Sequence, residues 1–214
     1  MLNTVKSRGA GKQIATLIAA LVVSLTTFAQ GETKHLITIN DMPVGGYIGA
    51  GGRLTTVESN TAGFLDGKIV AVINEKWGVG FSFSALHYDR GMNELVNDGA
   101  YHLSAGYAGI FVERIFKLSE DFRFSVSITS GMGEAYYQYD KDYRKDKVWS
   151  EEIIDKTTFA VFEPAVEFNY NISGNYWIGI TGGFRNTSPL ELIGADDSLF
   201  QKFTGGVTFK YGLF

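Results

Sequence analysis

The chain has 214 residues, of which 45% are hydrophobic, 14% aromatic and 20% charged, and its formal net charge is −4. This length and apolar content fit one folded domain and exclude a disordered chain. The acidic balance disfavours a nucleic-acid partner. The lack of cysteine excludes disulfides, thiolate zinc sites and cysteine nucleophiles. After the N-terminal region no apolar run reaches about 18 residues, so the composition does not fit a helical membrane protein.

The N-terminal residues 1–29 predict a secretory signal peptide. Lys6, Arg8 and Lys12 precede an apolar run at 14–25, and Thr27 and Ala29 occupy the −3 and −1 positions of a cleavage site. A retained membrane anchor is the alternative, although the apolar run is short for that role. The mature domain is then 30–214. Its net charge is −7, because the removed segment carries three basic residues and no acidic one.

Eight β-strands are predicted in the mature domain, because apolar and small or polar residues alternate along it. The alternation is clearest at 77–88, from 122 and from 200, and no segment of similar length has a helical period. In chain order the strands occupy 46–58, 62–74, 77–88, 101–116, from 122 to 129, 157–171, 175–187 and from 200 onward. The fold class is therefore all-β.

The bulky face of these strands decides which kind of barrel they form. One series holds large side chains, including Trp77, Phe81 and Phe203, whereas the other holds glycine, serine, threonine and charges. Eight strands enclose too little volume for so many aromatic rings. With the rings facing lipid, no crowding arises. The sequence thus predicts an eight-stranded antiparallel up-and-down transmembrane β-barrel, and a lipocalin-like soluble barrel is the alternative.

Connector lengths favour the bacterial outer membrane. Short connectors at 74–76, 117–121 and 171–175 alternate with long ones at 89–99, 134–156 and 187–199, and only the first outer loop, at 59–62, is short. Outer-membrane barrels have short periplasmic turns and longer extracellular loops. Both termini are accordingly expected in the periplasm, and the long loops outside.

The chain resembles a family of small outer-membrane β-barrel proteins of Bacteroidetes-type bacteria. The motifs are GGYIGAGGRLT, VINEKWGVGFSFSALHY, GYAGIFVERIF, FEPAVEFNYNI, YWIGITGGFR and FTGGVTFKYGLF, which cover most of the mature domain. The resemblance implies the fold and the location and adds no catalytic residue. The final strand ends on Phe214, similar to the signal that the barrel-assembly machinery recognises, although Phe214 is out of phase with Phe209, Tyr211 and Leu213.

Charged side chains are expected inside the barrel. The strand phases point ten of them inward, with the phase of Glu113 ambiguous: Arg53, Asp66, Lys68, Glu113, Arg123, Glu163, Glu167, Arg185, Lys202 and Lys210. A lone buried charge is costly. We therefore expect an ion network in which Glu163 and Glu167 bind some of Arg53, Arg123 and Arg185. Such a network plugs the lumen, or it lines a narrow charged conduit or gate.

Catalytic and metal-binding patterns are weak, which predicts a protein that is not an enzyme and has no cofactor or metal. Glu163 and Glu167 are close carboxylates, but neighbouring inward positions of one strand give that spacing anyway. His87 and His102 flank the 89–99 loop without an acidic third ligand. No GxSxG nucleophile motif occurs. Asp140, Asp142 and Asp146 are interleaved with basic residues, as in a solvated loop rather than a calcium site.

The longest loop is the candidate partner surface. Tyr139, Tyr143 and Trp149 stand among charges there, and such rings suit contacts with an extracellular protein, a glycan or lipopolysaccharide. Tyr136 and Tyr137 are instead expected to continue the aromatic belt of the wall. The predicted function is a non-enzymatic outer-membrane protein with a side-chain-plugged charged lumen, acting in envelope structure or surface interaction. The alternative is a narrow transporter or channel for small solutes or lipophiles.

Overall fold

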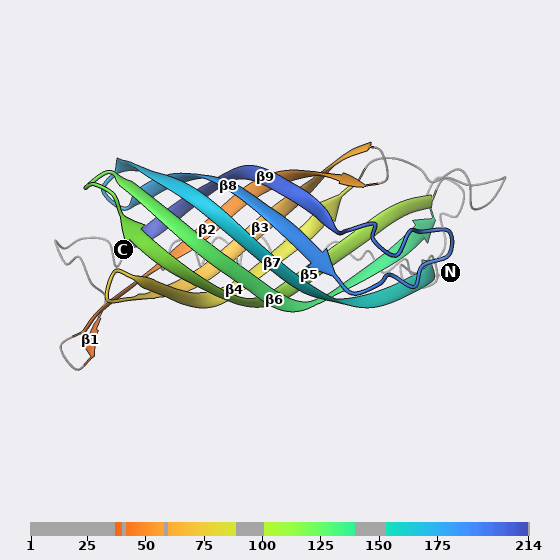
Figure 1. Cartoon of the computed structure of the whole chain (residues 1–214), viewed down its shortest axis with the longest axis horizontal. Coiled ribbons are helices and arrows are strands. Elements are labelled where there is room, and N and C mark those ends of the chain that lie inside the picture. The colour runs from red at the N-terminus through yellow and green to blue at the C-terminus, as the bar shows by residue number, and fades with distance from the viewer. Residues whose placement is uncertain (1–36, 40–41, 58–59, 89–100, 140–152, 214) are drawn as a thin grey trace, which may run out of the picture. The chain divides into compact units, whose positions relative to one another are not determined.

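A closed antiparallel barrel accounts for nearly all of the described part of the computed structural model, which comprises residues 37–39, 42–57, 60–88, 101–139 and 153–213 (Figure 1). The described strands are β1 (Ile37–Ile39), β2 (Met42–Val57), β3 (Asn60–Ile73), β4 (Trp77–His87), β5 (Tyr101–Lys117), β6 (Phe122–Tyr139), β7 (Ile153–Ser173), β8 (Tyr176–Thr187) and β9 (Lys202–Leu213). Each strand pairs with its neighbour in sequence, and β2 also pairs with β9. Strands β2 to β9 thus form the predicted eight-stranded up-and-down barrel, and that prediction is confirmed.

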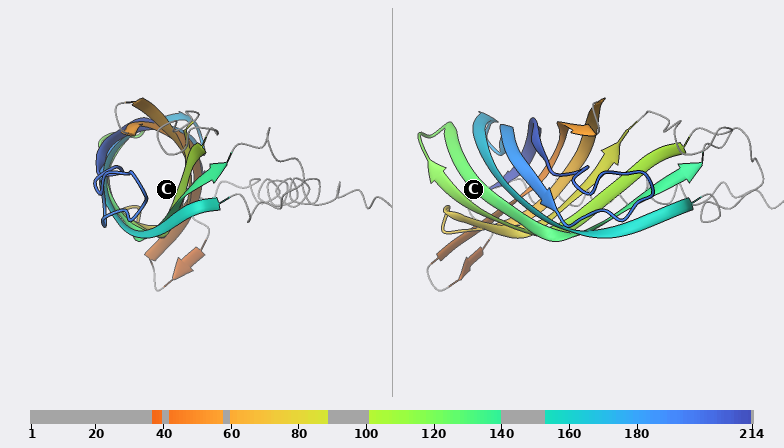
Figure 2. Two further views of the ribbon diagram at one scale, coloured as in Figure 1. Left: turned by 90° about the vertical axis from the view of Figure 1, so that its right-hand side faces the viewer. Right: turned by 45° about the vertical axis from the view of Figure 1, so that its right-hand side comes forward.

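Alternation along the strands places the large apolar side chains on the outside of the barrel. Phe81 is 68% exposed, Ile180 is 69% exposed and Phe203 is 80% exposed, whereas the intervening Ser82, Thr181 and Thr204 are buried. The serines, threonines and charges therefore line the interior of the barrel, whose ring of strands is seen end-on in Figure 2, left. A soluble barrel has the opposite arrangement, with its apolar side chains buried inside.

The ladder that closes the barrel depends on a close approach of two backbones. Gly206 of β9 is paired with Arg53 of β2. A Cβ atom on Gly206 would overlap the carbonyl oxygen of Gly52 and lie 2.7 Å from the Cα of Arg53. Only glycine fits there without moving a strand.

Tight turns join the strands at one end of the barrel, here called the short-turn rim. The β3–β4 turn places Asn74 and Glu75 at φ 53°, and the β7–β8 turn places Gly174 at φ 53°. Left-handed backbone suits asparagine and glycine, whereas Glu75 carries some strain. The opposite end, here called the long-loop rim, carries the β4–β5, β6–β7 and β8–β9 connectors. The predicted alternation of short and long connectors is thus observed.

The bounds of β6 and β7 and the presence of β1 differ from the sequence prediction. Strand β6 continues to Tyr139 and β7 begins at Ile153, so the predicted 134–156 loop is strand at both ends. In the extended part of β6, Tyr136 pairs with Ser104 of β5 and with Lys156 of β7. The two neighbouring strands therefore provide hydrogen-bond partners for its backbone. Strand β1 was not predicted, because three residues are too few to show a period. No described segment forms a helix long and apolar enough to cross a membrane.

The β8–β9 connector, residues 188–201, folds back into the barrel and is here called the capping segment (Figure 2, left). Leu190, Leu192, Leu199 and Phe200 are at most 5% exposed. They pack with inward residues of the long-loop half, among them Phe64, Leu103, Tyr137 and Phe159. The sequence prediction treated 187–199 as an outer loop and began the last strand at Phe200. Phe200 lies instead in the capping segment, where its ring packs 5.6 Å from that of Phe159.

Hydrogen bonds within the capping segment fix its path. Leu199 N donates to the Asp196 carbonyl at 2.9 Å, and Gln201 N donates to the Ser198 carbonyl at 2.9 Å. The hydroxyl and amide of Ser198 also donate to the Asp196 carboxylate, and these bonds lower the pKa of Asp196. Gln201 Nε2 reaches the carbonyl of Thr187 at 3.0 Å, which ties the segment back to β8. The capping segment is therefore a folded element rather than an open loop.

Candidate functional site

The candidate site is the barrel interior, where the strand phases bring polar residues together from all around the wall. Among the predicted lumen residues, Glu113, Glu163, Glu167, Arg123, Arg185 and Lys210 are at most 9% exposed. Arg53, Asp66 and Lys68 are half-buried inside the same wall, and Lys202 is half-buried at the start of β9. The ambiguous phase of β5 is resolved with Glu113 inward and Arg114 outward.

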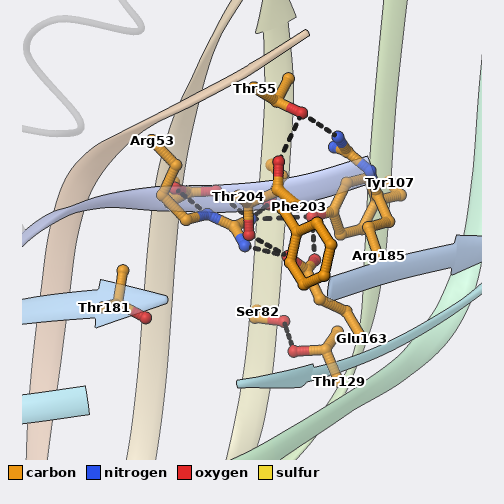
Figure 3. Close-up of polar contacts among 12 residues, drawn as sticks. Arg53, Thr55, Ser82, Tyr107, Thr129, Glu163, Thr181, Arg185, Phe203 and Thr204 are labelled. Atoms are coloured by element: carbon orange, nitrogen blue, oxygen red, sulfur yellow. Dashed lines mark hydrogen bonds and ion pairs between the residues drawn. The ribbon is translucent and has the colours of Figure 1, made fainter. Parts of the chain in front are cut away.

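Arg53 is the centre of one group of polar contacts, here called the Arg53 cluster (Figure 3). Its guanidinium binds both oxygens of Asp66, with Nε to Oδ2 at 2.7 Å and Nη2 to Oδ1 at 2.8 Å. Arg53 Nη1 also forms an ion pair with Glu163. Three hydroxyls complete the cluster: Ser84 donates to Asp66 at 2.6 Å, Tyr107 donates to Glu163, and Thr204 donates to Glu163 at 3.1 Å. One cation is thus shared by two carboxylates from different strands.

A second group, here called the Glu167 cluster, lies one step further along β7. Glu167 forms an ion pair with Lys210 and accepts from Lys68 Nζ at 3.3 Å. The same lysines lie over aromatic rings, Lys210 at 4.6 Å from the centroid of Tyr47 and Lys68 at 4.9 Å from that of Phe111. Tyr47 in turn donates to Glu113 at 2.7 Å. Glu163 and Glu167 are four positions apart on β7, which is about 13 Å of strand, so the two clusters occupy different levels.

The arginines Arg185 and Arg123 contact aromatic rings. The guanidinium of Arg185 lies 4.1 Å from the centroid of Phe64, and its Nε donates to the carbonyl of Phe200 at 3.1 Å. Arg123 lies 4.5 Å from the centroid of Trp177. The sequence analysis expected Glu167 to bind an arginine, whereas the described ion pairs give it two lysines. The reason is the stagger between strands, which sets the level at which residues from distant strands meet.

One void among the described residues lies beside the Arg53 cluster. It has a volume of about 30 Å³ and lies among Arg53, Asp66, Ser82, Thr129 and Glu163, which is room for about one or two waters. Ser82 and Thr129 hydrogen-bond across it at 3.2 Å. The capping segment and its apolar partners lie between this void and the long-loop rim. Toward the short-turn rim Tyr47, Val70, Val72, Phe111 and Ile115 form a second apolar group.

Sequence reasoning missed the tyrosines of the interior. Tyr107 and Tyr47 were read only as strand residues, yet each donates to a buried glutamate. A sequence signal was available, because both are bulky residues at inward phase among small ones. Tyr137 was expected in the outer belt, and that expectation is wrong: its side chain is 2% exposed and packs inside the long-loop half. Tyr136, the outward neighbour, is half-buried in the wall.

The remaining residues singled out in the sequence are only partly described. His102 is half-buried on β5, and the side chain of His87 lies outside the described part. In the described ranges no group of three or more histidine, aspartate or glutamate residues could hold a metal ion. Tyr139 ends β6, but its side chain, Tyr143, Trp149 and Asp140 to Asp146 lie outside the described residues, as does Phe214. The partner surface therefore stays a prediction.

Comparison with known proteins gives structural likeness alone. No protein-family model and no curated protein sequence matches the chain significantly. Ail, the attachment invasion locus protein of Yersinia pestis, solved with the heparin analogue sucrose octasulfate, is 13% identical over 79% of this chain and 97% of its own, with a TM-score of 0.47. Neisserial surface protein A is 10% identical over 79% of this chain and 96% of its own, with a TM-score of 0.48.

A loop-deletion form of OmpT, an outer membrane protein of Vibrio cholerae, is 10% identical over 82% of this chain and 50% of its own, with a TM-score of 0.32. At these identities and TM-scores the likeness is no argument for a shared partner or activity. The resemblance to Bacteroidetes-type barrels stays a prediction.

Proposed function

We propose that this chain is a bacterial outer-membrane barrel with a closed interior, acting without catalysis in envelope structure or surface interaction through its long-loop rim. The observation that supports the proposal is the packing of charged and apolar side chains inside the barrel. Ion clusters, an apolar group and the capping segment occupy successive levels of one narrow barrel. A conduit needs a continuous aqueous path, and about 30 Å³ is too small for one.

Support for the membrane location comes from the outer wall. Arg114 on β5 faces outward near the short-turn rim, and Glu134 and Lys156 face outward near the long-loop rim. Between them the described outward positions hold no charged residue. Gly106, the partner of Glu134, is eight residues from Arg114, about 26 Å of strand, which a tilt of about 40° reduces to about 20 Å of height. A membrane barrel has an apolar band of about 25 Å.

Aromatic side chains gather where such a band would meet water. Near the short-turn rim Phe122 packs against Tyr170 with ring centroids 5.0 Å apart, and Tyr176 packs against Tyr211 at 4.9 Å. All four side chains lie on the outward face of their strands. Tyrosine and tryptophan favour the membrane–water interface because one end of the ring system is apolar and the other is polar. With the short-turn rim periplasmic, as such turns are in outer-membrane barrels, the long loops face outward from the cell.

The test of the closed lumen is solute flux through liposomes that carry the refolded, heat-modifiable chain. We expect no flux above that of empty liposomes for the wild type or for Glu163→Ala, because the capping segment and the Glu167 cluster still fill the barrel. A variant that replaces residues 189–200 by a short glycine–serine linker serves as the sensitised control. Flux through the wild type that changes in Glu163→Ala would instead establish the alternative function, a narrow channel.

Surface interaction is tested separately at the 140–152 connector. Deleting 141–150 leaves β6 and β7 intact, because these strands end at Tyr139 and begin at Ile153. We expect the deletion variant to fold and to lose adhesion or binding that intact cells show, and substitution of Tyr143 and Trp149 by serine to reproduce part of that loss. Unchanged adhesion and unchanged envelope integrity in the deletion variant would contradict this role.

A further inference from the structure

A basic hollow lies at the short-turn rim, outside the charged interior. It has a volume of about 580 Å³ and lies between the β3–β4 turn, the start of β2 and the end of β5. Three cationic residues line it: Lys76, Arg114 and Lys117. The apolar part of the lining comes from Pro43, Ile115 and Phe116. The hollow thus combines cationic and apolar residues at the rim of the barrel.

Backbone hydrogen bonds hold this hollow in shape. Asn74 N donates to the carbonyl of Pro43 at 2.8 Å, and Ile115 N donates to the carbonyl of Lys76 at 2.8 Å. The β3–β4 turn is therefore tied to both neighbouring strands, and Lys76 is placed beside the end of β5. The lining also includes the acidic residue Glu75, and Lys117 Nζ pairs with Glu120 at 2.9 Å. The cation that faces the wall itself is Arg114.

The surroundings of Arg114 indicate what it binds. Its guanidinium lies 4.8 Å from the ring centroid of Trp77 and 5.7 Å from that of Phe116. These rings hold the guanidinium against the outer wall by cation–π attraction. An outward arginine in a membrane barrel is costly at the bilayer centre and costs little at headgroup depth. There the first anion it meets is a lipid phosphate, which the guanidinium fork binds with two parallel hydrogen bonds.

We propose that the hollow formed by Lys76, Arg114 and Lys117 is a binding site for the headgroup of an anionic phospholipid in the periplasmic leaflet. The phosphate binds Arg114, the lysines attract the net negative charge of the headgroup, and an acyl chain lies along Trp77 and Phe116. This inference rests on the proposed membrane location. The inference goes further than the location, because it names the class of lipid that binds at one position of the short-turn rim.

Quenching of tryptophan fluorescence by brominated lipids tests the site directly. Trp77 is 48% exposed on the outer wall, whereas Trp177 is 5% exposed inside the barrel. The signal of Trp77 is the difference between the wild type and Trp77→Phe. The full chain is refolded into phosphatidylcholine vesicles in which a minor fraction is either brominated phosphatidylglycerol or brominated phosphatidylcholine. We expect phosphatidylglycerol to be enriched about fivefold next to Trp77, the ratio that one membrane-surface cation provides.

Three variants distinguish the site from general attraction to charge. Arg114→Gln should lose the preference, Arg114→Lys should keep most of it, and Lys76→Gln should reduce it. Lys156→Gln is the matched control, because Lys156 is an outward, exposed cation at the opposite rim. Each variant is first shown to retain the wild-type difference in gel mobility between heated and unheated samples. Salt at 1 M should weaken the preference, since it shortens the Debye length to about 3 Å.

Two results would overturn the inference in different ways. Equal quenching of Trp77 by the two brominated lipids, or an undiminished preference in Arg114→Gln, refutes the headgroup site and leaves the membrane location intact. Absence of quenching by either lipid means that Trp77 does not face a bilayer, which refutes the proposed location and this site with it.

Discussion

Removing the carboxylate of Glu163 tests the energetics of the Arg53 cluster. The Glu163 side chain is 3% exposed, and that of Arg53 is 13% exposed. In Glu163→Ala the guanidinium keeps its bidentate bond to Asp66, but Nη1 loses its anion, and the hydroxyls of Tyr107 and Thr204 lose their acceptor. Breaking a buried ion pair by removing one partner costs about 3 to 5 kcal/mol. Because Asp66 still compensates Arg53, we expect the lower end, about 3 kcal/mol.

Reversible unfolding in urea of the chain refolded into lipid vesicles measures this loss. The outward Glu134→Ala is the control, because Glu134 is a half-buried carboxylate at the rim, and a surface change of this kind costs within about 0.5 kcal/mol. Glu163→Gln should fall between them, since the amide oxygen still accepts a hydrogen bond but carries no charge. Tyr107→Phe alone should cost about 1 kcal/mol.

A double-mutant cycle decides whether the cluster acts as one unit. In the absence of Glu163, the Tyr107 hydroxyl has lost the acceptor that justified its burial, so Tyr107→Phe should cost less in Glu163→Ala than in the wild type. The coupling energy should exceed about 0.5 kcal/mol. Additive losses, or a cost of Glu163→Ala no larger than that of Glu134→Ala, would show that the observed contacts do not stabilise the barrel.

Two further predictions concern the capping segment and the closing ladder. Phe200→Ala should lower the free energy of unfolding by about 3 to 5 kcal/mol, because it empties the space between Phe159 and Arg185. Ile193→Ala, at a residue 66% exposed, should be nearly neutral. Urea unfolding and limited proteolysis within 188–201 measure both variants, and equal effects would show that the segment is not packed. Gly206→Ala should reduce the yield of the heat-modifiable folded form, because its Cβ would overlap the carbonyl oxygen of Gly52, whereas Gly205→Ala, whose nearest neighbour would be the Thr181 oxygen at 3.9 Å, should fold normally. Equal refolding yields on gels would contradict the steric account.

The face of each strand could be predicted from the sequence because the side-chain period of a strand is two. One anchoring residue fixes a whole strand: with Phe81 outward, Ser82 and Ser84 must point inward, and the structure places them so. Strand β5 was the difficult case, since small residues such as Gly106 and Ala108 blur the contrast between its faces. The prediction was weakest where the polar and apolar series are least distinct.

Partners across the lumen could not be predicted, because the period says which way a side chain points and not at what height it meets another strand. Height follows from the stagger of the ladders around the barrel. Glu163 and Arg53 are 110 residues apart in sequence, and they meet only after the registers of the intervening strands accumulate. The same accumulation gives Glu167 the amines of Lys68 and Lys210 in place of an arginine.

The capping segment was missed for a different reason. Residues 188–201 carry proline, glycine and three acidic residues, which is the composition of a solvent-exposed loop. Its four buried apolar side chains have neither the strand nor the helix period, because they fill the open end of a barrel that other residues have already built. Such a segment has no independent core, so its fold is a property of the cavity it enters. The capping segment should therefore fold only after the barrel closes. During refolding, the change in Trp177 fluorescence should precede the protection of 188–201 from protease. Protection that develops before barrel closure would show that the segment folds on its own.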